Sequence, residues 1–325
     1  MKRRNFIVAL GSAAVMPLAA RAQQGPMPVI GILHSQTPES ESSRMVPILQ
    51  GLREAGFEPS RNLTIEHRYA EGRNDRLPAL ATELVQRQVN VIFANTTPPA
   101  NAAKAATAAI PIVFVTGVDP VKVGLVASLN RPGGNITGVT FLSNTLVAKR
   151  LELLSDVAPP ATPIGMLAAQ VNPNTDTDVN DSMAAAKALG RILHVTKVAP
   201  DGDVEPPVVA LLKLGVKALF VAPQADFRMW RQQLVLLAAR HALPTSFSSS
   251  DHVTAGGLMS YGPDQAESYR QAGNYAGRIL KGERPANLPV MQSTKFELVI
   301  NLKTAKALGI AMPAPMLALA TNVIE

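Results

Sequence analysis

Two apolar patterns alternate along the chain from about residue 28 to its end. Short runs of continuously apolar, often β-branched residues end in small polar residues, and each is followed by a longer stretch in which apolar residues recur every three or four positions. The short runs are typical of parallel strands buried on both faces, and the longer stretches are typical of helices with one buried side. This alternation predicts an α/β fold with parallel sheets.

Residues 91–120 show this unit most clearly. Apolar runs at 91–94 and 112–115 flank an alanine-rich segment that predicts a helix to about residue 109. Ligands bind just outside the carboxyl ends of the strands in open α/β sheets. We therefore expect the polar residues that follow the two runs to line one wall of a cleft: Asn95, Thr96, Thr97, Thr116 and Asp119. Asp119 precedes a proline, so shaping that turn is its alternative role.

Two successive series of such units, separated near residue 141, predict two similar α/β lobes. The first series predicts strands at 29–33, 63–69, 91–94, 112–115 and 136–140, and further helices at 44–55, 76–88 and 121–129. The second predicts strands at 164–168, 192–198, 218–222, 244–247, 258–261 and 296–300, and helices at 146–157, 175–190, 203–214, 227–241, 264–281 and 304–308. A cleft between two such lobes is a common site for a small ligand.

Polar residues follow the remaining strands in the same way and complete the expected site. They are Ser35 after the first strand, Asn172, Asn174 and Thr175 after 164–168, Gln224 and Asp226 after 218–222, and Ser248, Ser249 and Asp251 after 244–247. The helices that follow Thr97 and Thr175 would point backbone N–H groups at an anion, and these two threonines are equally suited to cap them. Asp226 either caps the helix at 227–241 or faces a cation. Trp230, among apolar helix residues, is expected in the core.

The amino end predicts an export signal at residues 1–22. A positive cluster at residues 2–4 precedes an apolar run to about residue 20, and Ala20-Arg21-Ala22 has the small-x-small pattern of a cleavage site. Arg3-Arg4-x-Phe6 fits the twin-arginine pattern, and the general secretory route is the alternative. Either route places the mature protein in the periplasm. Removing the signal takes away four basic residues and lowers the net charge from +7 to +3.

The composition of the chain and the motifs that it lacks exclude several classes of function. The 325 residues contain no cysteine, which excludes disulfides, thiolate metal sites and cysteine nucleophiles. No Gly-x-Gly-x-x-Gly follows the first strand, and neither a Walker-type Gly-Lys-Ser/Thr nor a His-Glu-x-x-His motif is present. The sequence therefore predicts no cofactor, no metal and no catalytic constellation. A mildly basic chain without a clustered basic face gives no reason to expect nucleic-acid binding.

Several segments together resemble one known family. They include Gly51-Leu52-Arg53-Glu54-Ala55-Gly56-Phe57, Arg131-Pro132-Gly133-Gly134-Asn135, Gly256-Gly257-Leu258-Met259-Ser260-Tyr261-Gly262 and Phe296-Glu297-Leu298-Val299-Ile300-Asn301. The chain resembles the ABC-transporter substrate-binding family that includes the tryptophan-binding proteins of Gram-positive bacteria. The resemblance implies the type I periplasmic-binding-protein fold, in which two Rossmann-like lobes joined by three crossovers close on a ligand like a hinge.

This likeness implies a division of the chain. We expect lobe 1 to comprise residues 28–141 and 249–290, and lobe 2 to comprise residues 142–248 and 291–325. Hinge segments are expected at 140–142, 245–248 and 290–294.

The likeness to the family's binding residues is uneven. Thr97-Pro98, Asp119-Pro120 and Asn172-Pro173 match its Thr-Pro, Asp-Pro and Asn-Pro steps. Its amino-acid binders tend to show Pro-Thr-Asp-Asn where this chain has Pro223-Gln224-Ala225-Asp226, and Ser-Asp where it has Ser248-Ser249. A buried ammonium needs a carboxylate opposite it. Amino acids and amine-free carboxylates therefore both stay open as ligands, with Asp226 or Asp251 as the replacement carboxylate.

The sequence thus predicts an extracytoplasmic receptor of an ABC importer, a monomer that captures a small organic ligand and presents it to a permease in the inner membrane. An exported α/β enzyme acting in the same cleft is the alternative from another class, since its strand-end polar residues would look the same. A ligand-binding subunit that feeds a sensor is a third reading that the sequence does not separate from the first.

Overall fold

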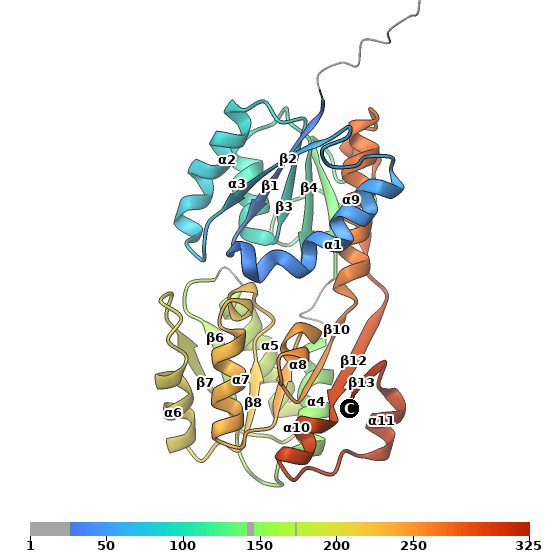
Figure 1. Ribbon diagram of the computed structural model, residues 1–325. Helices are drawn as coiled ribbons and strands as arrows, with labels where there is room; N and C mark the ends of the chain where they lie inside the picture. Colours follow the sequence, from blue (N-terminus) through green and yellow to red (C-terminus); the bar gives the residue numbers. More distant parts are fainter. Residues whose placement is uncertain (1–26, 142–145, 173) are drawn as a thin grey trace, which may run out of the picture.

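The computed structural model describes residues 27–141, 146–172 and 174–325, which form two α/β lobes, one above the other in Figure 1. The sheet of lobe 1 has the strand order β11 (Met291–Gln292), β5 (Ile136–Thr140), β4 (Ile112–Thr116), β3 (Val91–Asn95), β1 (Val29–His34), β2 (Thr64–Tyr69), and all these strands are parallel. The export signal predicted at residues 1–22 lies outside the described residues.

The sheet of lobe 2 has the order β13 (Asn322–Ile324), β12 (Phe296–Asn301), β10 (Met259–Pro263), β9 (Thr245–Phe247), β8 (Ala218–Val221), β6 (Ile164–Ala169), β7 (Leu193–Val198). Within it β10 and β12 pair antiparallel, and the other described pairs are parallel. The fold predicted from the alternating pattern and from the family resemblance is confirmed.

Helices cover both faces of the first sheet (Figure 1). Helices α2 (Leu77–Gln86) and α3 (Thr97–Ala106) pack on one face through buried residues such as Leu84 and Ala103. Helices α1 (Pro38–Glu54) and α9 (Gln265–Leu280) pack on the other, through residues such as Leu52 and Tyr269. Buried apolar strands between two helical layers are what the continuous apolar runs predict.

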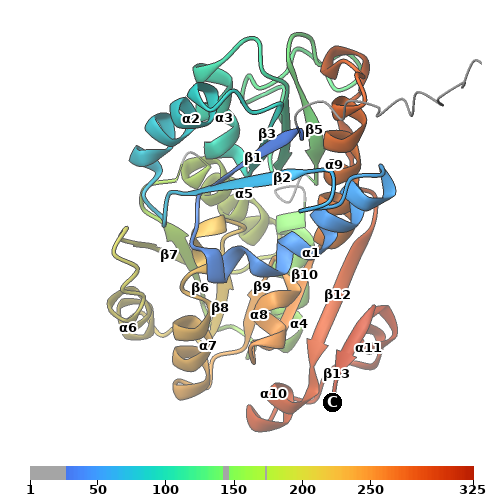
Figure 2. The same cartoon turned by 45° about the horizontal axis from the view of Figure 1, so that its top comes forward.

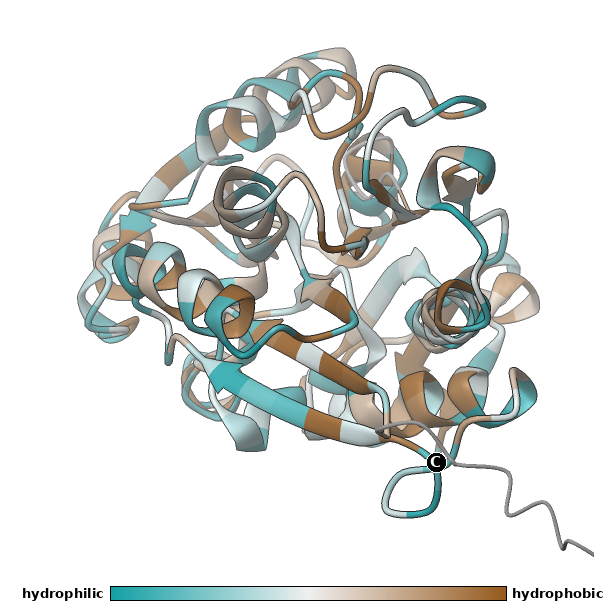
Figure 3. Cartoon of the chain, turned by 90° about the horizontal axis from the view of Figure 1, so that it is seen from above, coloured by the Kyte–Doolittle hydropathy of each residue, from teal (hydrophilic) through white to brown (hydrophobic). Residues whose placement is uncertain are grey.

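The second sheet is covered in the same way. Its helices are α4 (Val147–Val157), α5 (Thr175–Ala188), α6 (Glu205–Lys213), α7 (Arg231–Arg240), α8 (Ser250–Thr254), α10 (Leu302–Ala307) and α11 (Ala314–Leu319). Fully buried Arg150 of α4 donates to the carbonyl oxygens of Val221 (2.6 Å) and Ser246 (3.1 Å), which ties the ends of β8 and β9 together. Figure 3 shows the outer helices with hydrophilic and hydrophobic residues on the same ribbon, as expected for helices with one buried side.

The chain crosses between the lobes three times, but two predicted boundaries are wrong. The boundary predicted after residue 290 falls too early, because β11 (Met291–Gln292) pairs with β5 in the first sheet. The boundary predicted after residue 248 falls too early as well. After β10 the chain leaves lobe 2 at Pro263–Asp264, because β10 pairs in parallel with β9 and belongs to the second sheet. Residues 249–263 therefore lie in lobe 2, and the segment 245–248 is strand β9 and the turn after it rather than a hinge. The third crossover follows β11, where Ser293 N donates to Thr140 O (2.9 Å) and so joins the first and third crossovers. Figure 2 shows β12 running on from this point into lobe 2, where β13 lies beside it.

Most predicted elements are present, and the exceptions have local causes. Helix α1 begins earlier than predicted, because Thr37 Oγ1 accepts the Ser40 N–H (3.4 Å) and Pro38 occupies the first helical position. The helix predicted at 121–129 is absent: these residues form turns, with Asp119 Oδ1 accepting the Val121 N–H (2.9 Å). The helix predicted at 227–241 is divided into the 3-10 turn Ala225–Arg228 and α7. Strands β11 and β13 and helices α8 and α11 were not predicted. Among the described residues no helix is long and apolar enough to cross a membrane.

Candidate functional site

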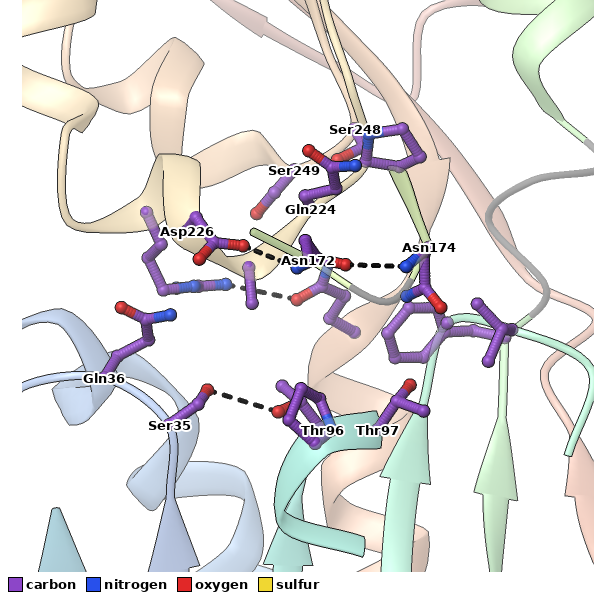
Figure 4. Close-up of a pocket in the computed structure, with 18 of the residues that line it drawn as sticks. Ser35, Gln36, Thr96, Thr97, Asn172, Asn174, Gln224, Asp226, Ser248 and Ser249 are labelled. Carbon is purple, nitrogen blue, oxygen red and sulfur yellow. Dashed lines mark hydrogen bonds between the residues drawn. The ribbon is translucent and has the colours of Figure 1, made fainter. Parts of the chain in front are cut away.

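The carboxyl ends of strands from both sheets face each other across a cleft between the lobes (Figure 4). The space open to the centres of water molecules is ≈ 70 Å³, where one water needs about 10–15 Å³ by that measure. The cleft therefore takes several waters or one small organic molecule. Its lining from lobe 1 is Ser35, Gln36, Arg44, Asn74, Thr96, Thr97, Pro98, Gly117, Val118, Phe141 and Gln265, and from lobe 2 Asn172, Asn174, Pro223, Gln224, Ala225, Asp226, Arg228, Ser248, Ser249 and His252.

Hydroxyl groups after β1 and β3 form the wall in lobe 1. Ser35 Oγ and Thr96 Oγ1 lie 3.2 Å apart and share a hydrogen bond, which Figure 4 shows at the base of the cleft. Thr96 has φ 130°, a value that favours glycine, so its backbone is strained where it meets the cleft. Helix α3 starts at Thr97, but Pro98 and Pro99 lack N–H groups. The predicted anion site of backbone N–H groups is therefore much reduced at this helix.

Gln224 organises the wall in lobe 2 after β6 and β8. Its Oε1 accepts the Ala169 N–H (2.6 Å), and its Nε2 donates to Thr175 Oγ1 (3.1 Å) and Asp178 Oδ2 (3.0 Å). Thr175 in turn donates to Ala169 O (2.6 Å). Because both ends of the Gln224 amide are engaged within lobe 2, this side chain fixes the loops after β6 and β8 to each other.

Asp226 places an uncompensated carboxylate in the cleft. Its side chain is 8% exposed, and its Oδ2 accepts a hydrogen bond from Asn172 Nδ2 (2.6 Å), drawn in Figure 4. Burial raises the pKa of the carboxyl above its ordinary value, although the Asn172 hydrogen bond opposes this. Among the described residues no basic side chain forms an ion pair with it. Asp226 does not cap α7, whose N-cap is Trp230, so it faces the cleft.

Two buried arginines, neither of them predicted, also line the cleft. Arg44 of α1 donates two hydrogen bonds to Glu41 (3.0 and 2.8 Å), while its Nε has no partner among the described residues. Arg228 pairs with Asp251 within lobe 2 and reaches lobe 1 through Ser43 Oγ (3.1 Å). Although burial opposes it, the guanidinium groups of Arg228 and Arg44 hold the pKa of Asp251 below its ordinary value.

Two amide oxygens of the lining are buried without a partner. Gln36 is 1% exposed, and its Oε1 accepts no hydrogen bond from the described residues. Asn74 Oδ1 is also buried and also accepts no hydrogen bond from them. Both come from lobe 1, directly after β1 and after β2. A buried acceptor without a donor costs free energy, so these atoms favour a ligand that donates hydrogen bonds. Sequence reasoning missed both residues, although Gln36 stands next to the predicted Ser35.

The structure separates the predicted site residues into two groups. Those in the lining are Ser35, Thr96, Thr97, Asn172, Asn174, Gln224, Asp226, Ser248 and Ser249. The others lie behind it or beside it: Asn95, Thr116, Asp119, Thr175 and Asp251. Asn95 is buried against Glu41 (2.5 Å), and Thr116 shares a hydrogen bond with Thr97 (2.7 Å). Asn95 and Thr116 are the last residues of β3 and β4, and through these hydrogen bonds they contact residues near the lining rather than the cleft itself.

The described residues contain no cluster of three or more histidine or acidic side chains that would hold a metal ion. Trp230 is buried in the core of lobe 2, as predicted, with its ring edge-on to Phe227 at 5.3 Å. The lining residues thus include the carboxylate of Asp226, which has no ion pair among the described residues, and three buried atoms without a hydrogen-bond partner there: Gln36 Oε1, Asn74 Oδ1 and Arg44 Nε.

Two α/β lobes with mostly parallel sheets, facing each other across a polar cleft of small-molecule size, have the architecture of the two-lobe solute-binding proteins. Residues 35–324 match the family model of the ABC transporter substrate binding proteins, and the chain belongs to that family. The family predicted from the resemblance is therefore confirmed.

Individual relatives agree with this assignment. The chain is 28% identical to a tyrosine-binding protein of Clostridioides difficile (strain R20291), over 80% of this chain and 74% of that protein. Among solved structures, it resembles a conserved domain protein from Vibrio cholerae (26% identity, TM-score 0.84) and an ABC domain in complex with L-Trp from Streptococcus pneumoniae (27% identity, TM-score 0.82). Each match covers 91% of this chain and 99% of the other. The TM-score with a ligand-free, open structure of a Clostridium difficile substrate binding protein is only 0.65, at 26% identity and the same coverage.

Proposed function

We propose that the protein is an extracytoplasmic receptor of an ABC importer that captures an amino acid between its lobes and presents it to a membrane permease. Membership of the substrate-binding family supports the transport role, and the signal pattern at residues 1–22 supports export. The observation that carries the choice of ligand is Asp226, a buried carboxylate in the cleft without a cationic partner among the described residues.

An amino acid supplies the groups that this lining lacks. Its ammonium pairs with Asp226 and donates to the orphaned oxygens of Gln36 and Asn74, and its carboxylate accepts from the guanidinium of Arg44. Buried charges are stable only when they are paired, so both ends of the zwitterion are stabilised in this cleft. An amine-free acid would leave Asp226 unpaired and add a second negative charge beside it.

Binding both lobes at once would hold them together. Arg228 already joins the lobes through Ser43 Oγ (3.1 Å) and Gln265 Oε1 (3.2 Å). An ammonium held between Asp226 of lobe 2 and Gln36 of lobe 1 adds a contact that exists only when the lobes are closed. A ligand shifts a conformational equilibrium by its differential affinity for the two states, so such an amino acid drives hinge closure.

The test is a thermal-shift screen of the mature protein from Gln23 on, with matched ligand pairs. L-tyrosine, L-tryptophan and L-phenylalanine are each compared with the corresponding acid that lacks the amine. A ligand at ~100 times its Kd adds roughly 2.7 kcal/mol to the free energy of unfolding, which raises the Tm by several degrees. We expect a rise with an amino acid and none with its amine-free partner. Equal rises for both members of a pair would contradict an amino acid as the ligand.

A further inference from the structure

A chain of hydrogen-bonded side chains leads from the edge strand β2 to the binding cleft. His67 Nδ1 of β2 lies 3.1 Å from Nε2 of His34, the last residue of β1. His34 Nδ1 lies 3.3 Å from Asn95 Nδ2 of β3, which also donates to Glu41 Oε2 of α1 (2.5 Å). Arg44, whose side chain lines the cleft, donates to the same carboxylate oxygen (2.8 Å). We call these five side chains the histidine chain.

The histidine chain is buried except at its outer end. His34, Asn95 and Glu41 are 0% exposed, whereas His67 is half-buried. Burial, together with the nearby His67 and Arg44, lowers the pKa of His34 to about 3. Burial also lowers the pKa of His67 below its ordinary value. Because His67 reaches solvent and His34 does not, the first proton that the pair takes up as the pH falls goes to His67.

The other titratable groups around the two histidines keep their charge near neutral pH. The ring of Tyr69 stacks on the His34 ring with the centroids 4.3 Å apart. Its hydroxyl stays protonated, because burial raises its pKa and the charges of Glu41 and Glu39 add to this. On the opposite face of β2, acidic and basic side chains pair with each other and with residues of or next to α2: Glu66, Arg68, Glu83 and Arg87. The histidines are the side chains of this group that ordinarily change charge between about pH 5 and about pH 8.

The carboxylate of Glu41 fixes the direction of every hydrogen bond in the chain. A carboxylate only accepts, so Asn95 must turn its amide nitrogen rather than its oxygen toward Glu41. The second N–H of that amide then points at His34 Nδ1, which must accept it. Neutral His34 therefore carries its proton on Nε2 and donates to His67 Nδ1. Asn95 Oδ1 is left buried without a hydrogen-bond partner among the described residues.

Protonation of His67 reverses these directions. The pair takes up one proton from solvent, so that His67 carries protons on both ring nitrogens and its Nδ1 becomes a donor. His34 Nε2 must then accept, and the single proton of His34 moves to Nδ1. This new donor faces Asn95, where only the unpartnered Oδ1 accepts it. The amide turns over to present that oxygen, and Glu41 loses the hydrogen bond from Asn95.

We propose that the histidine chain is a proton switch, in which uptake of one proton at His67 turns the Asn95 amide and so changes how Arg44 is held at the cleft. After the switch Arg44 is the one remaining donor to Glu41 among the described residues. The guanidinium is then drawn toward Glu41 and binds a ligand carboxylate less well. This last step rests on the proposed function, in which Arg44 binds the carboxylate of the ligand.

The tautomer of His34 tests the switch without any ligand. The mature protein, labelled with ¹⁵N in its histidines, is titrated by NMR from about pH 7.5 to about pH 5. We expect the His34 proton to move from Nε2 to Nδ1 in the same step that protonates His67. His67→Gln supplies an amide oxygen that accepts the His34 N–H but takes up no proton, so its His34 is expected to keep the proton on Nε2. The matched control is His194→Gln, because His194 is likewise half-buried on an edge strand, β7 of the second sheet.

A ratio of affinities tests the effect on the cleft. L-tyrosine, L-tryptophan and L-phenylalanine are each compared with their primary carboxamides by titration calorimetry at about pH 7 and about pH 5. Both members of a pair carry the ammonium, so protonation of Asp226 affects them alike and cancels in the ratio. The preference for the carboxylate is expected to fall by about tenfold or more on acidification in the parent and in His194→Gln. In His67→Gln the preference is expected to stay constant.

The outcomes separate the switch from the function on which its last step rests. If His34 kept its tautomer while His67 took up a proton, the switch would be overturned. A carboxylate preference that did not fall on acidification, or that fell equally in all three proteins, would overturn the link to Arg44. If the folded protein bound none of the amino acids, the proposed function would fail, while the tautomer of His34 would still decide the switch.

Discussion

Replacing Asp226 by asparagine should abolish tight amino-acid binding and at the same time leave the ligand-free protein at least as stable. The substituted amide keeps the size of the side chain and an oxygen that accepts the Asn172 Nδ2 hydrogen bond (2.6 Å). The change therefore removes one negative charge from the cleft and little else.

The expected loss of affinity follows from the burial of the pair. Truncating one partner of a buried, hydrogen-bonded charge pair costs about 2–5 kcal/mol, which corresponds to a Kd about 30-fold to about 5,000-fold higher. Stability should change in the other direction. Because burial raises the pKa of Asp226 in the folded state, the folded protein holds its proton more tightly than the unfolded chain does. The protonated carboxyl of Asp226 therefore contributes stability below its pKa in the unfolded chain, and this contribution is lost as the pH rises through its raised pKa in the folded protein. The Asp226→Asn side chain carries no charge, so the variant avoids this loss near neutral pH.

Two measurements on the same samples test this reasoning: calorimetric titration with the tightest amino acid, and urea unfolding of the ligand-free protein. The matched control is Asp176→Asn, which removes the same charge from a side chain that is 92% exposed and pairs with Lys197 at the surface. Undiminished affinity in Asp226→Asn would refute the ammonium site. A large loss of stability together with the loss of binding would show that Asp226 is structural rather than ligand-binding.

Three further predictions concern pH, packing and closure. Amino-acid affinity should fall as the pH drops from neutral to about 4, because Asp226 becomes protonated on passing its raised pKa, and calorimetry on Asp226→Asn should show no such step. Gly51→Ala should lower the free energy of unfolding by about 1–3 kcal/mol in urea titrations, because the new Cβ would overlap the Arg270 carbonyl where α1 crosses α9. The control, Val46→Ala on the exposed face of α1, should cost less than about 0.5 kcal/mol. Arg228→Gln should weaken the contact of this side chain with lobe 1 and raise the radius of gyration of the ligand-free protein in X-ray scattering, and an unchanged radius would show that other contacts hold the lobes together.

Part of the site could be predicted from the polar residues that follow the apolar strands in the sequence. Parallel strands bring their carboxyl ends to one edge of a sheet, so Ser35, Thr96 and Asp226 could be assigned to a cleft from their positions after apolar runs. The same rule misplaced Asn95 and Thr116 by one layer. A pattern of apolar residues in the sequence does not show which residue after a strand is the first to reach the cleft.

The two arginines of the lining could not be predicted from the sequence, for a different reason. Arg44 and Arg228 stand in helical or 3-10 segments, where a basic side chain is ordinarily solvated. These side chains are buried because α1 of lobe 1 and the turn before α7 of lobe 2 lie against each other across the cleft. The sequence of either segment alone does not show this contact. Partners far apart in the sequence, such as Arg228 and Ser43, leave no local signal.

The wrong lobe boundary after residue 248 has a similar origin. Strand β10 carries the same local pattern as strands of either lobe, and the polar break after β9 looked like a crossover. Its parallel pairing with β9 places it in the second sheet. Local periodicity identifies a strand but does not identify the sheet that the strand joins.

The most direct test of the account is a crystal structure of the mature protein with the amino acid that binds most tightly in the paired screen. The account predicts the ammonium nitrogen within hydrogen-bond distance, about 2.7–3.1 Å, of the Asp226 carboxylate, with the ligand carboxylate turned toward Arg44. A ligand bound in the reverse orientation, or with its ammonium held by other groups while Asp226 faces water, would contradict it.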